Sequence, residues 1–97
     1  MLFRSVLTNK KTAEEKTVAV DGVFIAVGMI PETKAYEGLV ELNSTGYIVA
    51  DETGITSCPG IFAAGDIRTK ELRQVVTAAS DGANAVQSVE RYLTESN

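Results

Sequence analysis

The sequence contains no histidine, no tryptophan and only one cysteine, Cys58, among its 97 residues. Without histidine, the chain cannot form a metal site of the usual histidine and cysteine type, or a Ser-His or Cys-His catalytic arrangement. A single cysteine cannot form a disulfide framework, and Cys58 is predicted to be a small buried or half-buried hydrophobic residue. We therefore expect no catalytic residue and no metal site, and any chemistry performed here requires a bound reagent.

Long apolar runs and clusters of basic residues are also absent. No apolar stretch approaches the roughly 20 residues needed to cross a bilayer, and the opening residues MLFRSVL are too short an apolar run for a signal peptide. Nine basic and 13 acidic residues give a net charge of −4, which argues against nucleic acid or an anionic membrane as partner. We predict a protein of the reducing cytoplasm with one small core.

The residues that are present alternate between short β-type segments and one helical segment, so we predict an α/β fold. Residues 2–28 have the pattern of a small antiparallel β-meander, with strands at LFRSVLT, TVAV and VFIAVG. Residues 29–56 are broken by Pro31 and several glycines, and contain one predicted strand, GYIVAD. After a Pro-Gly turn, IFAAG is predicted to be a further strand.

A long C-terminal helix is predicted to follow, because apolar residues recur at intervals of three and four and give it one apolar face. These positions are Leu72, Val75, Val76, Ala79, Ala83, Val86, Val89 and Leu93. Gly82 interrupts the helix at a cost of about 1 kcal/mol relative to alanine. It indicates either a close approach of another backbone or a cofactor, or simple packing of the helix on a sheet.

The stretch GIFAAGDIR places Asp66 directly after a short apolar strand and a few residues before the helix. Gly-Asp pairs are common in turns, so Asp66 is readily explained as a turn residue that faces solvent. In open α/β sheets, however, ligands bind just beyond the carboxyl ends of strands. A carboxylate there can accept hydrogen bonds from the hydroxyls of a ribose or polyol, and Gly65 would allow the ligand to approach the backbone.

The run TSCPGIFAAGD, residues 56–66, resembles the second flavin-binding motif of the pyridine-nucleotide disulfide oxidoreductases. The segments GVFIAVGMIPET and LRQVVTAASDGANAVQSVERYL narrow the resemblance to the low-molecular-weight thioredoxin reductases. The resemblance implies that Asp66 holds a ribityl hydroxyl of FAD, and that Arg73, Gln74 and Val75 open the helix beside the flavin ring. The helix start supports this independently, since unpaired N–H groups at Gln74 and Val75 could donate to a flavin oxygen.

The resemblance also implies that the chain is the C-terminal third of such an enzyme, a partial Rossmann-like domain that binds FAD or NAD(P). Residues 1–30 would be the tail of the NADPH-binding domain, residues 31–56 a crossover connector, and residues 57–97 the C-terminal half of the FAD-binding domain. The parent would pass electrons from NADPH through FAD to a protein disulfide, with thioredoxin as partner. The sequence has neither G-x-G-x-x-G nor C-x-x-C, so the isolated chain is predicted to be inactive.

Two other interpretations stay open. The first is a related flavoprotein, either an alkyl hydroperoxide reductase flavoprotein subunit or a ferredoxin–NADP reductase of the thioredoxin-reductase type; Arg73 and Gln74 favour thioredoxin reductase. The second is a non-catalytic α/β interaction module in which Asp66 is a structural relic. Because partial sheets expose edges, we expect a homo-oligomer, formed through the apolar face of residues 72–93 or through a sheet edge.

Overall fold

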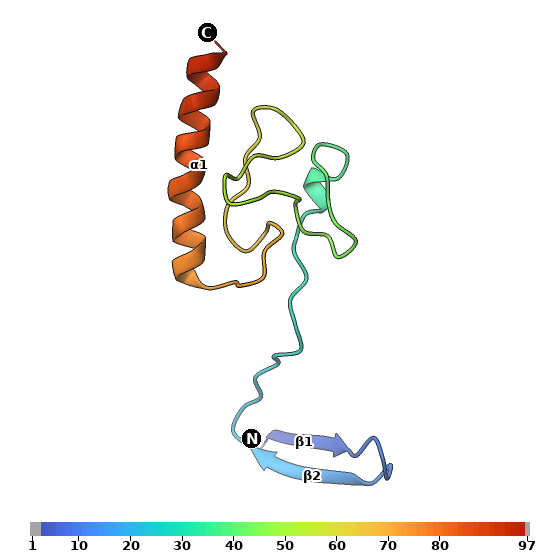
Figure 1. Ribbon diagram of the computed structural model, residues 1–97. Helices are drawn as coiled ribbons and strands as arrows, with labels where there is room; N and C mark the ends of the chain where they lie inside the picture. Colours follow the sequence, from blue (N-terminus) through green and yellow to red (C-terminus); the bar gives the residue numbers. More distant parts are fainter. Residues whose placement is uncertain (1–2, 97) are drawn as a thin grey trace.

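The computed structural model describes residues 3–96 and consists of a β-hairpin, an irregular central region and one long α-helix (Figure 1). The elements in chain order are β1 (Phe3–Thr8), β2 (Glu15–Val20), the short 3-10 helix η1 (Lys34–Tyr36) and α1 (Val75–Glu95). The first two predicted strands and the long C-terminal helix are therefore confirmed. None of the helices within residues 3–96 is long and apolar enough to cross a membrane.

The hairpin is closed by a turn that Asn9 organises. Strands β1 and β2 pair antiparallel, with Phe3 opposite Val20. The side-chain Oδ1 of Asn9 accepts a hydrogen bond from the N–H of Lys11 at 2.9 Å, and the Asn9 N–H donates to the carbonyl of Glu14 at 2.9 Å. Such Asn contacts satisfy the turn backbone locally. The hairpin contacts neither η1 nor α1, so it is tied to the rest of the molecule only through the chain that follows it.

The third strand of the predicted meander, at residues 23–28, does not form. Residues 21–32 run as an irregular tether between the hairpin and the remainder of the chain (Figure 1), and their backbone makes no hydrogen bond within the described residues 3–96. The segment VFIAVG is apolar at every non-glycine position, which is typical of a strand buried on both faces of a larger sheet. The chain offers no such sheet, so the segment stays open to solvent.

The two later predicted strands, residues 46–51 and 61–65, are each reduced to isolated β-bridges. Ile48 bridges to Leu42 and to Arg68, and Phe62 bridges to Ile55. Glycines with positive φ flank both segments and turn the chain before a ladder can extend; they are Gly46, Gly54, Gly60 and Gly65. The central region is therefore held by single bridges and by packing.

A small core lies within this central region, and α1 runs along one side of the region (Figure 1). Its buried apolar residues are Val40, Ile48, Ala50 and Ala63. The helix turns Asp81 and Ser88 inward, while Val75, Val76 and Val86 on its apolar face stay exposed. Two explanations for Gly82 are wrong for this chain, the close approach of another of its backbone segments and packing on a sheet, since a Cβ added there would meet no atom of the described residues within 4 Å.

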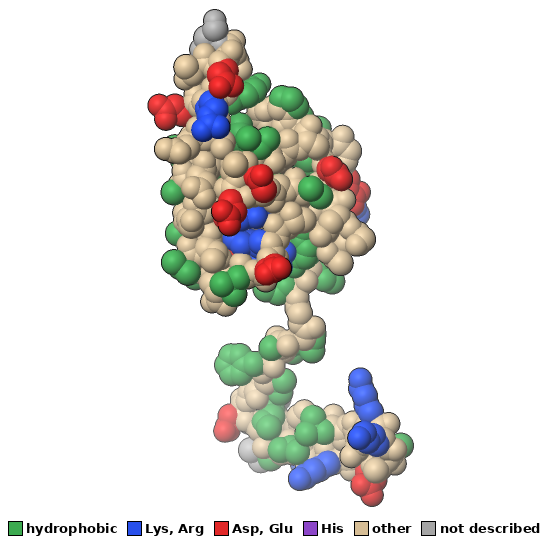
Figure 2. All heavy atoms as spheres, in the orientation of Figure 1, with side chains coloured by type: hydrophobic (Ala, Val, Ile, Leu, Met, Phe, Trp, Pro, Cys, Tyr) green, Lys and Arg blue, Asp and Glu red, His purple; other side chains and the backbone are tan. Residues whose placement is uncertain are grey.

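The molecule as a whole is elongated, with principal extents of 66 × 26 × 24 Å. Figure 2 shows the compact part carrying α1, the narrow tether with its apolar side chains, and the hairpin at the far end. A two-stranded hairpin alone is marginally stable in water. Stable packing is therefore concentrated in residues 33–96.

Candidate functional site

Asp66 lies on an exposed turn that Gly65 creates. Gly65 has a φ of 84°, a conformation that residues other than glycine rarely adopt, and its buried N–H donates to Oδ2 of Asp81 at 2.9 Å. The turn leaves Asp66 exposed, and its carboxylate has no hydrogen-bonding or ionic partner within residues 3–96. The Gly65 N–H is occupied by Asp81, whereas the Asp66 carboxylate is available to a ligand.

Arg73 braces this turn. Its Nε donates to the carbonyl of Asp66 at 3.0 Å and its Nη2 donates to the carbonyl of Arg68 at 3.2 Å. The guanidinium also lies 3.8 Å from the ring centroid of Tyr47, a favourable cation–π distance. The Arg73 side chain therefore links the turn, the central region and the residues just before α1.

The helix begins two residues later than the predicted opening at Arg73, and Leu72, predicted on its apolar face, lies before it. Gln74 is the N-cap of α1, which starts at Val75. The Gln74 N–H donates to the Thr77 hydroxyl at 3.1 Å, and so it is not free for a ligand. The N–H groups of Val75 and Val76 have no partner in the described part of the chain, and both residues are exposed. These first-turn amides keep the partial positive charge of a helix N-terminus.

A mainly apolar cavity of about 230 Å³ joins the tether to this turn. Its lining residues are Met29, Ile30, Pro31, Glu32, Tyr47, Asp66, Ile67 and Arg73. Of the five residues predicted from sequence, the structure brings Asp66 and Arg73 together at this cavity. Gly65 lies behind it, and Gln74 and Val75 follow at the helix start, outside the lining.

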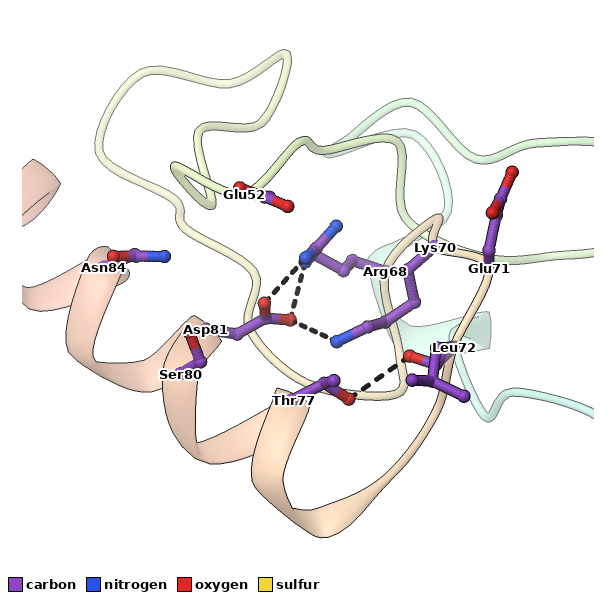
Figure 3. Close-up of a pocket in the computed structure, with 9 residues that line it drawn as sticks. All are labelled: Glu52, Arg68, Lys70, Glu71, Leu72, Thr77, Ser80, Asp81 and Asn84. Carbon is purple, nitrogen blue, oxygen red and sulfur yellow. Dashed lines mark hydrogen bonds and ion pairs between the residues drawn. The ribbon is translucent and has the colours of Figure 1, made fainter.

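A second cavity of about 430 Å³ is lined in part by a buried ion cluster centred on Asp81, a residue that no sequence motif singled out (Figure 3). Asp81 is 5% exposed. Arg68 donates to both carboxylate oxygens at 2.6 Å, from Nε to Oδ2 and from Nη2 to Oδ1. Lys70 Nζ lies 2.9 Å from Oδ2. With the Gly65 N–H, one carboxylate receives hydrogen bonds from three different residues of the loop 65–70.

These donors shift the titration of the cluster. The Arg68 hydrogen bonds hold the pKa of Asp81 well below its usual range, and Lys70 and the Gly65 N–H act in the same direction against the opposing effect of burial. The same pairing raises the pKa of Arg68. The spacing of small residues could have indicated Asp81. It lies three residues after Ala78 and four before Ala85, so it shares a helix face with these two small side chains.

The family comparison covers most of the chain. The family model described as pyridine nucleotide-disulphide oxidoreductase matches residues 4–82. The chain belongs to this family. That match includes the predicted flavin motif, the turn at Asp66 and the start of α1, so the resemblance drawn from the sequence is confirmed at the level of the family.

Individual relatives are thioredoxin reductases. The chain is 49% identical over 89 residues to those of Listeria monocytogenes and Bacillus subtilis, a match that covers 92% of this chain and 28% of each relative. Among solved structures, it matches Lactococcus lactis thioredoxin reductase at 40% identity with a TM-score of 0.82, covering 93% of this chain and 30% of that one. The Streptococcus pyogenes enzyme matches at 46% identity with a TM-score of 0.75. The chain thus spans about 30% of the length of its relatives.

Proposed function

We propose that the chain is the C-terminal FAD-binding portion of a thioredoxin-disulfide reductase and is inactive in isolation. The whole enzyme would take electrons from NADPH, pass them through FAD and reduce a disulfide in thioredoxin. The observation that carries the proposal is the pairing of an available Asp66 carboxylate with an open helix N-terminus at Val75, in a family whose relatives are named thioredoxin reductases. Those names favour it over the related flavoproteins and over a non-catalytic module.

The residues present fit one side of a flavin site. The cavity at Asp66 and Arg73 offers a mainly apolar wall, the exposed carboxylate offers a hydrogen-bond acceptor, and the first turn of α1 offers unpaired N–H donors. A ligand with an apolar ring, hydroxyls and carbonyl oxygens uses all three. Bound flavin would supply two-electron redox chemistry that none of the side chains of this sequence supplies.

Each residue then has a distinct role. Asp66 would accept hydrogen bonds from the hydroxyls of a bound flavin, and the Val75 N–H would donate to a ring oxygen of the flavin. Arg73 holds the Asp66 backbone and stacks on Tyr47, so it orients the carboxylate. Gln74 caps the helix and keeps the Val75 amide at its end. Gly65 supplies the turn.

The proposal is tested by supplying the missing segment. The chain is fused to, or mixed with, the N-terminal part of the L. monocytogenes relative, and the product is expected to be yellow. In this complex Asp66→Asn should weaken FAD binding about ten- to a hundredfold, since a charge-assisted hydrogen bond contributes about 1.5–3 kcal/mol. Isothermal titration with FAD measures the difference.

Glu71→Gln is the matched control. Glu71 is also an exposed carboxylate close to the helix start, but it lines the other cavity. Its removal should leave FAD affinity unchanged. If the Asp66 and Glu71 variants bind FAD equally well, the carboxylate at Asp66 is a turn residue only and the proposed site is wrong. The predicted NADPH-binding tail at residues 1–30 and the cytoplasmic setting remain parts of this proposal.

A further inference from the structure

We propose that Asp81 is a positioning residue of the flavin site: it holds the turn that carries Asp66 at a fixed place beside the start of α1. The inference deepens the proposed function and rests on it. Asp81 itself would not contact flavin, since it is 5% exposed and lines a different cavity from the one at Asp66. A substitution at Asp81 therefore acts on flavin binding only through the turn.

The two groups offered to a flavin lie on different elements. The Asp66 carboxylate belongs to the loop before the helix, whereas the Val75 N–H belongs to the first turn of α1. Residues 67–74 between them form neither helix nor strand, so the connecting backbone does not by itself set their separation. A site that uses both groups needs each of them held close to its binding position by supporting contacts.

Asp81 supplies the link between the two elements. Its Oδ2 accepts a hydrogen bond at 2.9 Å from the N–H of Gly65, the residue directly before Asp66. A Cβ added at Gly65 would lie 3.6 Å from the Ala78 Cβ, so α1 also packs against this residue. Asp81 lies on the same continuous helix as Val75, about 9 Å further along its axis. Fixing Gly65 to Asp81 therefore fixes Asp66 relative to the Val75 amide.

The Asp81 carboxylate is itself held in one orientation. Arg68 donates to both of its oxygens at 2.6 Å, and such paired hydrogen bonds fix direction as well as distance. The Arg68 Nη1 donates to the Thr69 carbonyl at 2.9 Å, so the guanidinium is anchored as well. Lys70 approaches from the same loop, and Figure 3 shows both cationic side chains directed at Asp81. The carboxylate therefore cannot rotate away from the Gly65 N–H without breaking several hydrogen bonds.

Arg73 holds the other side of the same turn. Its Nε and Nη2 donate to the carbonyls of Asp66 and Arg68, while Asp81 accepts from the N–H of Gly65. The backbone is thus held immediately before and immediately after the Asp66 Cα, and the Asp66 side chain stays exposed. A binding group that is fixed in advance in this way loses less entropy when its ligand arrives.

The test is a double-mutant cycle on FAD affinity, measured by isothermal titration of the chain fused to the N-terminal part of the L. monocytogenes relative. Asp81→Asn keeps the size of the side chain but presents an N–H₂ group to the Arg68 donors, so the turn loses its anchor. It should weaken FAD binding at least about tenfold, and Asp66→Asn about ten- to a hundredfold. In the Asp66→Asn background, Asp81→Asn should weaken binding by less than about twofold, because residues that act through one another are not additive.

Two further variants separate positioning from loss of the fold. Tyr92→Ala loosens the same helix by removing the edge-on ring contact with Phe62, whose centroid lies 6.0 Å away. It leaves the loop 65–70 untouched, so FAD affinity should stay within about twofold of the parent. Arg68→Met combined with Asp81→Leu removes both charges of the pair, which destabilises far less than removing one. This double variant should keep the helix signal in circular dichroism and still bind FAD at least about tenfold more weakly.

Amide hydrogen exchange of the chain without flavin tests the anchor directly. The Gly65 amide should exchange at least about tenfold faster in Asp81→Asn, relative to the Ala85 amide of the same sample. An unchanged ratio overturns the inference, and so does an unchanged FAD affinity in the double variant of Arg68 and Asp81. Fully additive effects of Asp66→Asn and Asp81→Asn overturn it too. The proposed function fails by a different result, an Asp66→Asn variant that binds FAD like the parent, which also removes the site that Asp81 is proposed to position.

Discussion

At the scale of single residues, the Asp81 carboxylate joins α1 to the loop that carries Asp66. It accepts hydrogen bonds from Gly65, Arg68 and Lys70. Asp66 follows Gly65 directly, so the position of the proposed flavin-binding carboxylate depends on a contact 16 residues away. The resemblance to a flavin-binding motif predicts Asp66 and Arg73 because both lie within one short stretch of sequence. It could not predict the ion cluster, because that cluster exists only when the loop and the helix are packed together.

Replacing Asp81 should therefore destabilise residues 33–96 strongly. Asp81→Asn leaves the buried Arg68 and Lys70 without a compensating charge, which costs about 3–5 kcal/mol when one partner of a buried pair is removed. Urea unfolding followed by helix circular dichroism, at one fixed protein concentration, measures the loss. Glu71→Gln removes an exposed carboxylate from the same cavity and should change the free energy of unfolding by less than about 0.5 kcal/mol. Equal losses of unfolding free energy in the Asp81 and Glu71 variants would show that the ion cluster contributes little to stability.

The same residue predicts how stability depends on pH. The pKa of Asp81 is lowered in the folded state, so the folded state favours the ionised carboxylate relative to the unfolded chain, where aspartate titrates near its usual value of about 3.9. The contribution is complete well above that value and is lost progressively as the pH falls below about 5 and on through the lowered folded-state pKa. Acid titration of the unfolding midpoint should show this loss, and Asp81→Asn should reduce its slope. An unchanged slope would contradict the assignment.

At the scale of elements, α1 packs against the central region through Ala78 and Ala85 and through Tyr92, whose ring lies edge-on to Phe62 at 6.0 Å between centroids. Val75, Val76 and Val86 stay exposed. Gly54 lies close to both: a Cβ added there would lie 2.7 Å from the Ala63 carbonyl oxygen in the central region and 3.3 Å from the Ala85 Cβ on α1. The turn around Gly54 is thus held between the central region and the helix. The spacing of apolar residues predicts that α1 has an apolar face. It does not predict which face packs, because that depends on which side chains of α1 lie against the turn around Gly54.

Gly54→Ala should consequently cost more than an ordinary glycine substitution. Both Gly54 and Gly38 have positive φ, 73° and 81°, so alanine at either position is strained by about 1–2 kcal/mol. Only Gly54 adds a steric clash, and overpacking of this kind costs about 1–3 kcal/mol more. At Gly38 an added Cβ meets nothing within 4 Å. The free energies of unfolding of the two variants, obtained from thermal melts, should differ by the about 1–3 kcal/mol that the steric clash adds. Indistinguishable melts would exclude close packing at Gly54.

The strands show where prediction from sequence reaches its limit. The hairpin and α1 were predicted correctly because their hydrogen bonds close within the segment or between neighbouring segments. Residues 23–28, 46–51 and 61–65 have the composition of strands, but a strand also needs a neighbour to pair with. The relatives are about three times longer than this chain, and β-type segments without their neighbours remain as a tether or as single bridges.

At the scale of the whole molecule, the chain is a hairpin and a packed region joined by an apolar tether. Under the proposed function, it would supply only part of the route that electrons take. The proposed flavin contacts lie on residues 65–75. No two glycines of the sequence are separated by a single residue, so no G-x-G-x-x-G turn exists to bind a pyrophosphate. With one cysteine, the chain also lacks the dithiol that would receive electrons from flavin.

The purified chain should therefore show no NADPH-dependent disulfide reductase activity. With thioredoxin, NADPH, FAD and a chromogenic disulfide present, its rate should equal that of the blank without protein, while the B. subtilis thioredoxin reductase at equal molar concentration turns over. The reason is the absence from this sequence of both a nicotinamide-binding turn and a second cysteine, so adding FAD alone cannot restore the reaction. Heat-labile turnover above the blank would contradict the proposal, because electrons would then travel a route that these residues do not provide. Activity that appears only when the N-terminal part of the relative is added would instead support it, because the proposed flavin contacts of residues 65–75 would then complete a working enzyme.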